Sequence, residues 1–140
     1  MTKNKFSILK VFFAFAILAL VFVYFYTNNP TSGDAKFIRC PSNFLLGINC
    51  PGCGTQRALH HLLHFEIVDA LRYNAFFVLA IPVIMLYFLN WIRNELFNQN
   101  KQIKFLQNKK VLIALLIILI VFGIFRNINL YPFTLLSPNL

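Results

Sequence analysis

Charged residues are scarce in this chain, and acidic residues are the scarcest of them. Lys, Arg, Asp and Glu make up 12% of the 140 residues, with 13 basic residues against four acidic ones. Hydrophobic residues account for 59%, and the mean hydropathy is +0.67. This balance excludes an ordinary soluble domain and favours an integral membrane protein.

Familiar catalytic signatures are also lacking. The sequence holds no phosphate-binding glycine loop, no dinucleotide fingerprint, no Ser-His-Asp set and no internal repeat. Cysteine occurs three times, and two of these residues stand three positions apart. We therefore expect a single membrane domain over residues 1–140 that is a binding or assembly component rather than an enzyme, with its chemistry confined to the cysteines.

Three apolar runs are long enough to form membrane spans. A spanning helix needs about 20 residues, and the runs extend over residues 7–26, 75–92 and 111–129. The predicted fold class is therefore all-α, a polytopic membrane protein with three transmembrane helices. A cleaved signal peptide with its site at 33–35 is the alternative for the first run. The length of that run and its bulky end, Tyr24-Phe25-Tyr26, favour a retained anchor.

The basic residues predict the orientation of these helices, because Lys and Arg collect in cytoplasmic loops. Eight of the 13 lie at the N-terminus or in the loop after the second span: Lys3, Lys5, Lys10, Arg93, Lys101, Lys104, Lys109 and Lys110. We expect the N-terminus inside, and the C-terminus and first loop outside. The net charge of +9 follows from this topology and from attraction to anionic lipid, so no nucleic-acid partner is expected.

The first loop contains a short turn sequence with two cysteines, Cys50-Pro51-Gly52-Cys53-Gly54-Thr55-Gln56-Arg57. Pro51, Gly52 and Gly54 are turn formers, and apolar residues recur at helical spacing after Gly54. The pattern predicts a cysteine loop and one amphipathic helix, together occupying residues 40–73. This helix is expected to lie on the outer membrane surface or to pack against the spans.

The cysteines are compatible with three kinds of chemistry. A disulfide from Cys40 to Cys50 or Cys53 would stabilise the loop by about 2–4 kcal/mol, and this structural role is our leading interpretation. Cys50 and Cys53 also have the spacing of a thiol–disulfide oxidoreductase, in which case they form the catalytic pair. Together with His60 and His64 they offer four zinc ligands, and Cys40 can replace a histidine.

Two arginines suggest a binding site at the outer interface. Arg57 follows the cysteine turn, and Arg126 ends the third predicted span beside Asn127. A guanidinium near a helix N-terminus binds phosphate or carboxylate well. The hypothesis is a site for an anionic lipid or for a membrane protein partner. The alternative is that each arginine only reaches from a helix end to water.

Several of these segments occur together in one known pattern: Cys40-Pro41, Gly47 to Ala58, Leu62-Leu63-His64, Ala70 to Asn74, Pro82 and Arg126-Asn127. This pattern resembles a bacterial membrane family called domain of unknown function 2752. The resemblance covers residues 40–129 and implies a small polytopic protein of the bacterial inner membrane, with no known activity. Phe65 stands where the family usually has glycine, and Ala75 where proline often follows the asparagine.

Overall fold

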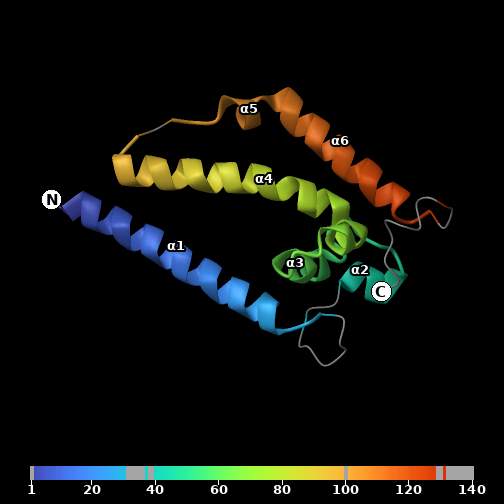
Figure 1. The fold of residues 1–140 in the computed structure, drawn as a ribbon. Coiled ribbons are helices and arrows are strands. Elements are labelled where there is room, and N and C mark those ends of the chain that lie inside the picture. Colours follow the sequence, from blue (N-terminus) through green and yellow to red (C-terminus); the bar gives the residue numbers. More distant parts are fainter. Residues whose placement is uncertain (1, 31–36, 38–39, 100, 129–130, 132–140) are drawn as a thin grey trace.

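The computed structural model describes residues 2–30, 37, 40–99, 101–128 and 131. All regular elements in these ranges are helices, which confirms the predicted all-α class. Helices α1 (Thr2–Thr27) and α4 (Ile67–Phe97) run side by side at one end and diverge toward the other, where α3 (Thr55–Leu63) lies between them (Figure 1). The signal-peptidase alternative at 33–35 and the last residue of the span predicted at 111–129 fall outside the described residues.

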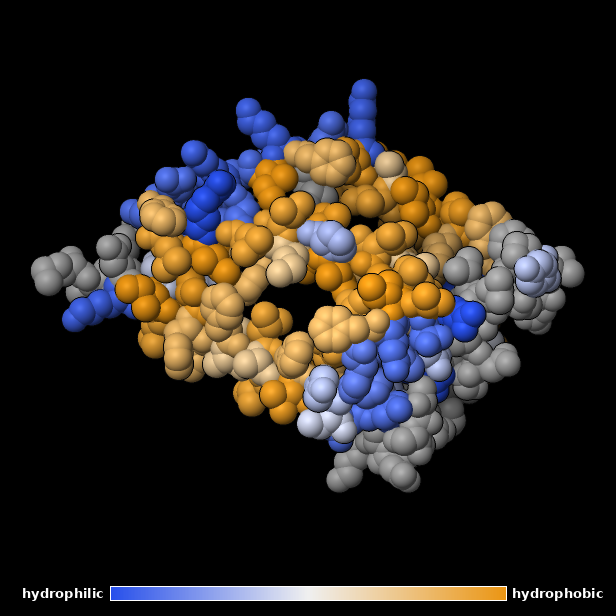
Figure 2. Space-filling model, viewed as in Figure 1, coloured by the Kyte–Doolittle hydropathy of each residue, from blue (hydrophilic) through white to orange (hydrophobic). Residues whose placement is uncertain are grey.

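The two longest helices have the length and composition of membrane spans. Lys5–Thr27 and Ile67–Phe97 are each apolar enough to cross a bilayer, and they match the runs predicted at 7–26 and 75–92. Figure 2 shows apolar side chains over most of one face of the molecule, with hydrophilic side chains gathered toward its margins. Because these side chains point away from the protein instead of into a core, both helices are compatible with a lipid-facing position.

The third apolar run forms a shorter helix than the other two. Helix α6 spans Lys109–Phe125, 17 residues, and its first turn is capped by the Asn108 side chain, which accepts a hydrogen bond from the Lys110 backbone N–H. A single turn, α5 (Lys104–Gln107), precedes it and was not expected. The count of three membrane spans therefore stays a prediction.

The predicted single helix after Gly54 consists of two pieces. Helix α3 ends at Leu63, and the chain turns before α4 starts at Ile67. The Phe65 N–H donates to the Leu62 carbonyl and the Glu66 N–H to the His61 carbonyl, which is the Schellman pattern of a helix C-terminus. This ending requires a left-handed residue, and Phe65 supplies it with φ +63°. The same requirement explains why the family usually has glycine at this position, because glycine adopts a left-handed backbone without strain.

A second break lies near the start of α4, at Asn74. Its backbone is extended, with φ −162° and ψ 88°, and its side-chain oxygen accepts a hydrogen bond from the Phe77 N–H. Asn74 thus caps the long apolar part of α4. Residues before proline favour this extended conformation. In this chain Ala75 replaces the proline that is common in the family, and the kink is present all the same.

The buried residues gather at one end of the molecule. Among described residues they are Cys53, Ala58, His60, Ala70, Asn74 and Arg126. At the opposite end, α1 and α4 are joined by an ion pair between Lys10 and Glu95 at 2.7 Å. The packed core is therefore not between the long helices but at the junction of α3, α4 and the end of α6.

Candidate functional site: a three-cysteine corner

A tight turn places two of the cysteines. The Cys53 N–H donates to the Cys50 carbonyl at 3.0 Å, and the Thr55 N–H donates to the Gly52 carbonyl at 3.2 Å. Gly54 then adopts φ +76° and stands at the N-cap of α3. The Thr55 hydroxyl donates back to the Gly52 carbonyl at 2.7 Å. Pro51, Gly52 and Gly54, the predicted turn formers, all lie in this turn.

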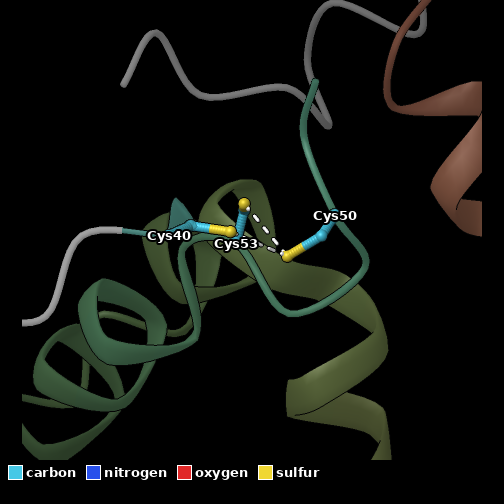
Figure 3. A group of neighbouring side chains, drawn as sticks. All are labelled: Cys40, Cys50 and Cys53. Carbon is cyan, nitrogen blue, oxygen red and sulfur yellow. Dashed lines mark hydrogen bonds between the residues drawn. The ribbon is translucent and has the colours of Figure 1, made fainter. Parts of the chain in front are cut away.

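The third cysteine reaches the turn from the start of α2 (Pro41–Leu46), where it is the N-cap residue. The Cys50 Sγ lies 3.2 Å from the Cys40 Sγ and 3.2 Å from the Cys53 Sγ, and all three sulfurs are within 4.8 Å of one another. Figure 3 shows the three side chains pointing toward a common centre. All three cysteines are free; Cys53 is only 3% exposed, while Cys40 and Cys50 are half-buried.

Two of the three thiols, Cys40 and Cys53, differ strongly in acidity. The hydrogen bond with the Ser42 hydroxyl, at 3.0 Å, is the main reason why the pKa of Cys40 falls to about 6, and the neighbouring thiols contribute further. Burial instead raises the pKa of Cys53 to about 12, and its two sulfur neighbours add to that rise. At neutral pH the free corner therefore carries a thiolate at Cys40 and a protonated thiol at Cys53.

Asn74 fastens the turn to α4. Its side-chain amide, 1% exposed, donates to the carbonyls of Pro51 and Cys53 at 2.9 and 3.2 Å, and it lies 3.1 Å from the Thr55 hydroxyl. The same side chain caps the helix through its oxygen. One buried asparagine thus fixes both the backbone of the cysteine turn and the direction of the long helix.

Arg126 is buried beneath the turn. Its guanidinium donates to the Tyr73 carbonyl at 2.7 Å, is 1% exposed and lies close enough to the cysteines to interact electrostatically with all three. A Cβ at Gly54 would come within 2.6 Å of the Tyr73 oxygen and 3.2 Å of this guanidinium. Only glycine therefore lets the turn approach both groups.

The end of α6 holds the turn from the other side. The Asn127 amide accepts from the Asn49 N–H at 2.8 Å and donates to the Asn49 carbonyl at 2.9 Å. One turn earlier, a Cβ at Gly123 would lie 3.1 Å from the Pro51 ring, so the helix packs directly on that proline. We call the assembly of residues 40, 49–55, 73–74 and 126–127 the cysteine corner.

The structure does not bring the predicted histidine ligands to the cysteines. His60 donates through Nδ1 to the Phe25 carbonyl of α1 at 2.7 Å. His64 stacks on Tyr26, with ring centroids 4.5 Å apart, and its Nδ1 bonds the His60 carbonyl. Both side chains lie on one helix face, four residues apart, and this face packs against α1. Among described residues the metal-ligand group at the corner consists of the three cysteines alone.

A second group of potential ligands lies at the bend between α3 and α4. His61, Glu66 and Asp69 approach one another, and the hydrogen bond with His61, at 2.5 Å, lowers the pKa of Glu66. Asp69 pairs with Arg72 at 3.3 Å. These contacts, one hydrogen bond and one ion pair, are local to the bend.

The two candidate anion-binding arginines contact the same residue from different sides. Arg57 lies over the Tyr73 ring at 5.8 Å, whereas Arg126 bonds the Tyr73 carbonyl inside the corner. Asn127, the third predicted member, binds the backbone of Asn49. The anion hypothesis therefore depends on Arg57, which is half-buried, and it stays a prediction.

Sequence reasoning missed three residues that organise the site: Ser42, Asn49 and Asn74. Asn74 was part of the family pattern, and a polar amide just before an apolar run was the available signal. No local signal predicts the contact between Asn49 and Asn127, because 78 residues separate them.

The fold and the site together define an all-α protein with two helices compatible with a membrane and a three-thiol corner at one end. Residues 40–88 match the family model described as protein of unknown function (DUF2752), which confirms the resemblance over this part of the chain. The matched region contains all three cysteines and Asn74, while Arg126 lies beyond it. Comparison with curated proteins gave no match, and neither did comparison with solved structures.

Proposed function

We propose that this protein is a small membrane protein whose cysteine corner binds a thiophilic metal ion. The convergence of three cysteine sulfurs within 4.8 Å of one another carries the proposal. A tetrahedral ion with metal–sulfur bonds of 2.3 Å holds its sulfurs about 3.8 Å apart. Adjacent sulfurs here are 3.2 Å apart, so shifts of about half an ångström would admit the ion.

The surroundings of the sulfurs support the same proposal. Metal binding requires deprotonated thiols, and the Arg126 guanidinium beneath the turn favours that state electrostatically. Asn74 and Asn127 hold the turn through its backbone, which leaves the sulfurs free to bind. Loss of residues that support the ligands without touching the metal typically weakens metal binding about 10–100-fold.

The proposal places the corner on the outer face of the bacterial inner membrane. It includes α6 as a third span, since its 17 residues reach about 25 Å, close to the roughly 30 Å hydrocarbon core of a bilayer. The N-terminus and the loop after α4 carry most of the basic residues, so they belong inside. The protein would then be a binding component, with an anionic lipid or a membrane protein as a further partner at Arg57.

The decisive experiment measures metal binding by the full-length protein in detergent. Purified protein is loaded with Zn²⁺, and the bound metal and its affinity are compared among variants. Cys40→Ser, Cys50→Ser and Cys53→Ser should each weaken binding by about 100-fold or more, since each removes a ligand. His64→Gln is the matched control, because that side chain lies against α1, and it should retain the wild-type affinity.

Two outcomes would overturn the proposal. One is a wild-type protein that binds no stoichiometric Zn²⁺ under reducing conditions, and the other is binding that survives all three cysteine substitutions. Protein yield and helical content measured by circular dichroism serve to identify a variant that has simply failed to fold.

A membrane thiol–disulfide oxidoreductase using Cys50 and Cys53 is the second candidate, favoured by the 3.2 Å between their sulfurs. Turnover of a dithiol substrate that depends on Cys53 and is insensitive to a chelator would support it. Metal binding predicts the opposite, because Cys53→Ser would then lower metal content without any catalytic activity to lose.

A further inference from the structure

We propose that oxidation of the cysteine corner to a Cys40–Cys50 disulfide, with Cys53 left as a thiol, releases the bound ion. The inference rests on the proposed metal site and adds its control by redox state. It follows from two observations, the central position of Cys50 and the different exposure of the three sulfurs.

Cys50 stands between the other two cysteines. Its sulfur is 3.2 Å from each of them, so an approach of about 1 Å would make a disulfide of normal length with either one. Distance alone therefore does not choose the partner. It does show that Cys50 is suited to take part in whichever disulfide forms.

Exposure selects the partner. An oxidising disulfide from outside must reach the first sulfur that it attacks, and Cys40 and Cys50 are half-buried while Cys53 is 3% exposed. Asn74 also holds the carbonyl of Cys53 against α4, which restrains this residue in place. Cys40 and Cys50 are thus the accessible pair.

The chemistry is two successive thiol–disulfide exchanges with a small disulfide, R–S–S–R, as the oxidant. The Cys40 thiolate attacks one sulfur, forms Cys40–S–S–R and expels the first R–S⁻. The Cys50 thiolate then attacks the Cys40 sulfur, forms Cys40–S–S–Cys50 and expels the second R–S⁻. Two electrons pass from the protein to the oxidant, and the ion keeps one thiolate of three, so it leaves as a cation.

The location predicted for the corner gives this reaction a setting. Disulfides form and persist outside the cytoplasm, and the orientation predicted from the basic residues puts the corner there. A reduced corner would hold the ion. An oxidised corner would lose the ion, and the Cys40–Cys50 disulfide would then link the start of α2 to the turn.

The test uses the full-length protein in detergent, loaded with Zn²⁺ and then treated with glutathione disulfide. Released Zn²⁺ is followed with a chelating dye, and the disulfide is mapped by alkylation and mass spectrometry. We expect one Zn²⁺ released per chain, in step with formation of a peptide pair containing Cys40 and Cys50. Cys53 should become alkylated only after the protein is denatured.

Two variants make the result specific. Cys53→Ser keeps the accessible pair and should still form the Cys40–Cys50 disulfide. Cys50→Ser should stop at a mixed disulfide between Cys40 and glutathione. A Cys50–Cys53 product, or release of Zn²⁺ without any protein disulfide, would overturn the inference. If the reduced wild type binds no Zn²⁺ at all, the proposed function itself fails, and this is seen before any oxidant is added.

Discussion

Single residues decide whether the cysteine corner can form, because each of its contacts depends on one side chain or on the lack of one. Gly54 gives the turn its left-handed backbone and the space for Tyr73 and Arg126. Ser42 sets the acidity of Cys40 through one hydrogen bond. Both effects can be tested separately from metal binding.

Gly54→Ala should lower the free energy of unfolding by about 2 kcal/mol or more, since it adds a backbone clash to a left-handed conformation. The clash is with the Tyr73 oxygen, 2.6 Å from the new Cβ. Gly47 is a matched control, because it has φ +66° with nothing within 4 Å, so Gly47→Ala should cost only about 1 kcal/mol. Thermal unfolding in detergent measures both, and equal losses would show that the clash is absent.

Cys40 should react with iodoacetamide in the metal-free protein with a midpoint near its pKa of about 6. Ser42→Ala should move that midpoint upward, toward the ordinary value of 9.0, because the hydrogen bond favouring the thiolate is lost. A lowered pKa stabilises the folded state above the unfolded pKa. This contribution falls between pH 9 and pH 6 and is lost below about 6.

That pH dependence can be measured by following thermal unfolding of the metal-free protein from pH 9 to pH 5. Cys40→Ser removes the titrating group and should flatten this part of the profile. A wild-type profile that matches the Cys40→Ser profile would contradict the assignment.

At the scale of elements, the sequence predicted what depends on hydropathy and missed what depends on contacts distant in the chain. The two long apolar helices and the cysteine turn were found because apolar length and turn residues are local signals. The helical pattern after Gly54 was recognised, but the direction of α3 was not, since Gly54 and Asn74 determine where that helix points. The break at Phe65 was missed because no glycine marks it.

The ending of α3 offers a test of this explanation. Phe65 is 90% exposed and holds φ +63°, so it adds strain without packing. Phe65→Gly should stabilise the protein by about 0.5–1 kcal/mol, the left-handed penalty less the entropy that glycine gains on unfolding. Phe65→Ala keeps the penalty and should give no such gain. Thermal unfolding of the two variants would settle the comparison, and a stabilised alanine variant would disprove the role of φ.

The whole molecule has opposite ends with different character. One end joins α1 and α4 through Lys10 and Glu95, and the other holds the cysteine corner and the end of α6. If the long helices cross the bilayer, these ends face different compartments. The position of the corner is therefore linked to the orientation predicted from the basic residues.

Labelling of intact cells with an impermeant thiol reagent tests this topology. Cys40 should be labelled from outside once reductant and chelator have freed it. In a variant lacking the native cysteines, a cysteine introduced at Gln99, after α4, should be labelled only after the membrane is permeabilised. The reverse pattern would show the opposite orientation.

The hold of Arg126 and Asn127 on the cysteine turn has a consequence for biosynthesis. Asn49 emerges from the ribosome 78 residues before Asn127. At ordinary elongation rates the turn therefore exists for several seconds without its hydrogen bonds to Asn127. If the predicted orientation holds, the three thiols would meet an oxidising compartment during that interval, while α6 is still being made. The corner can therefore close only after α6 and the two residues that follow it have been made.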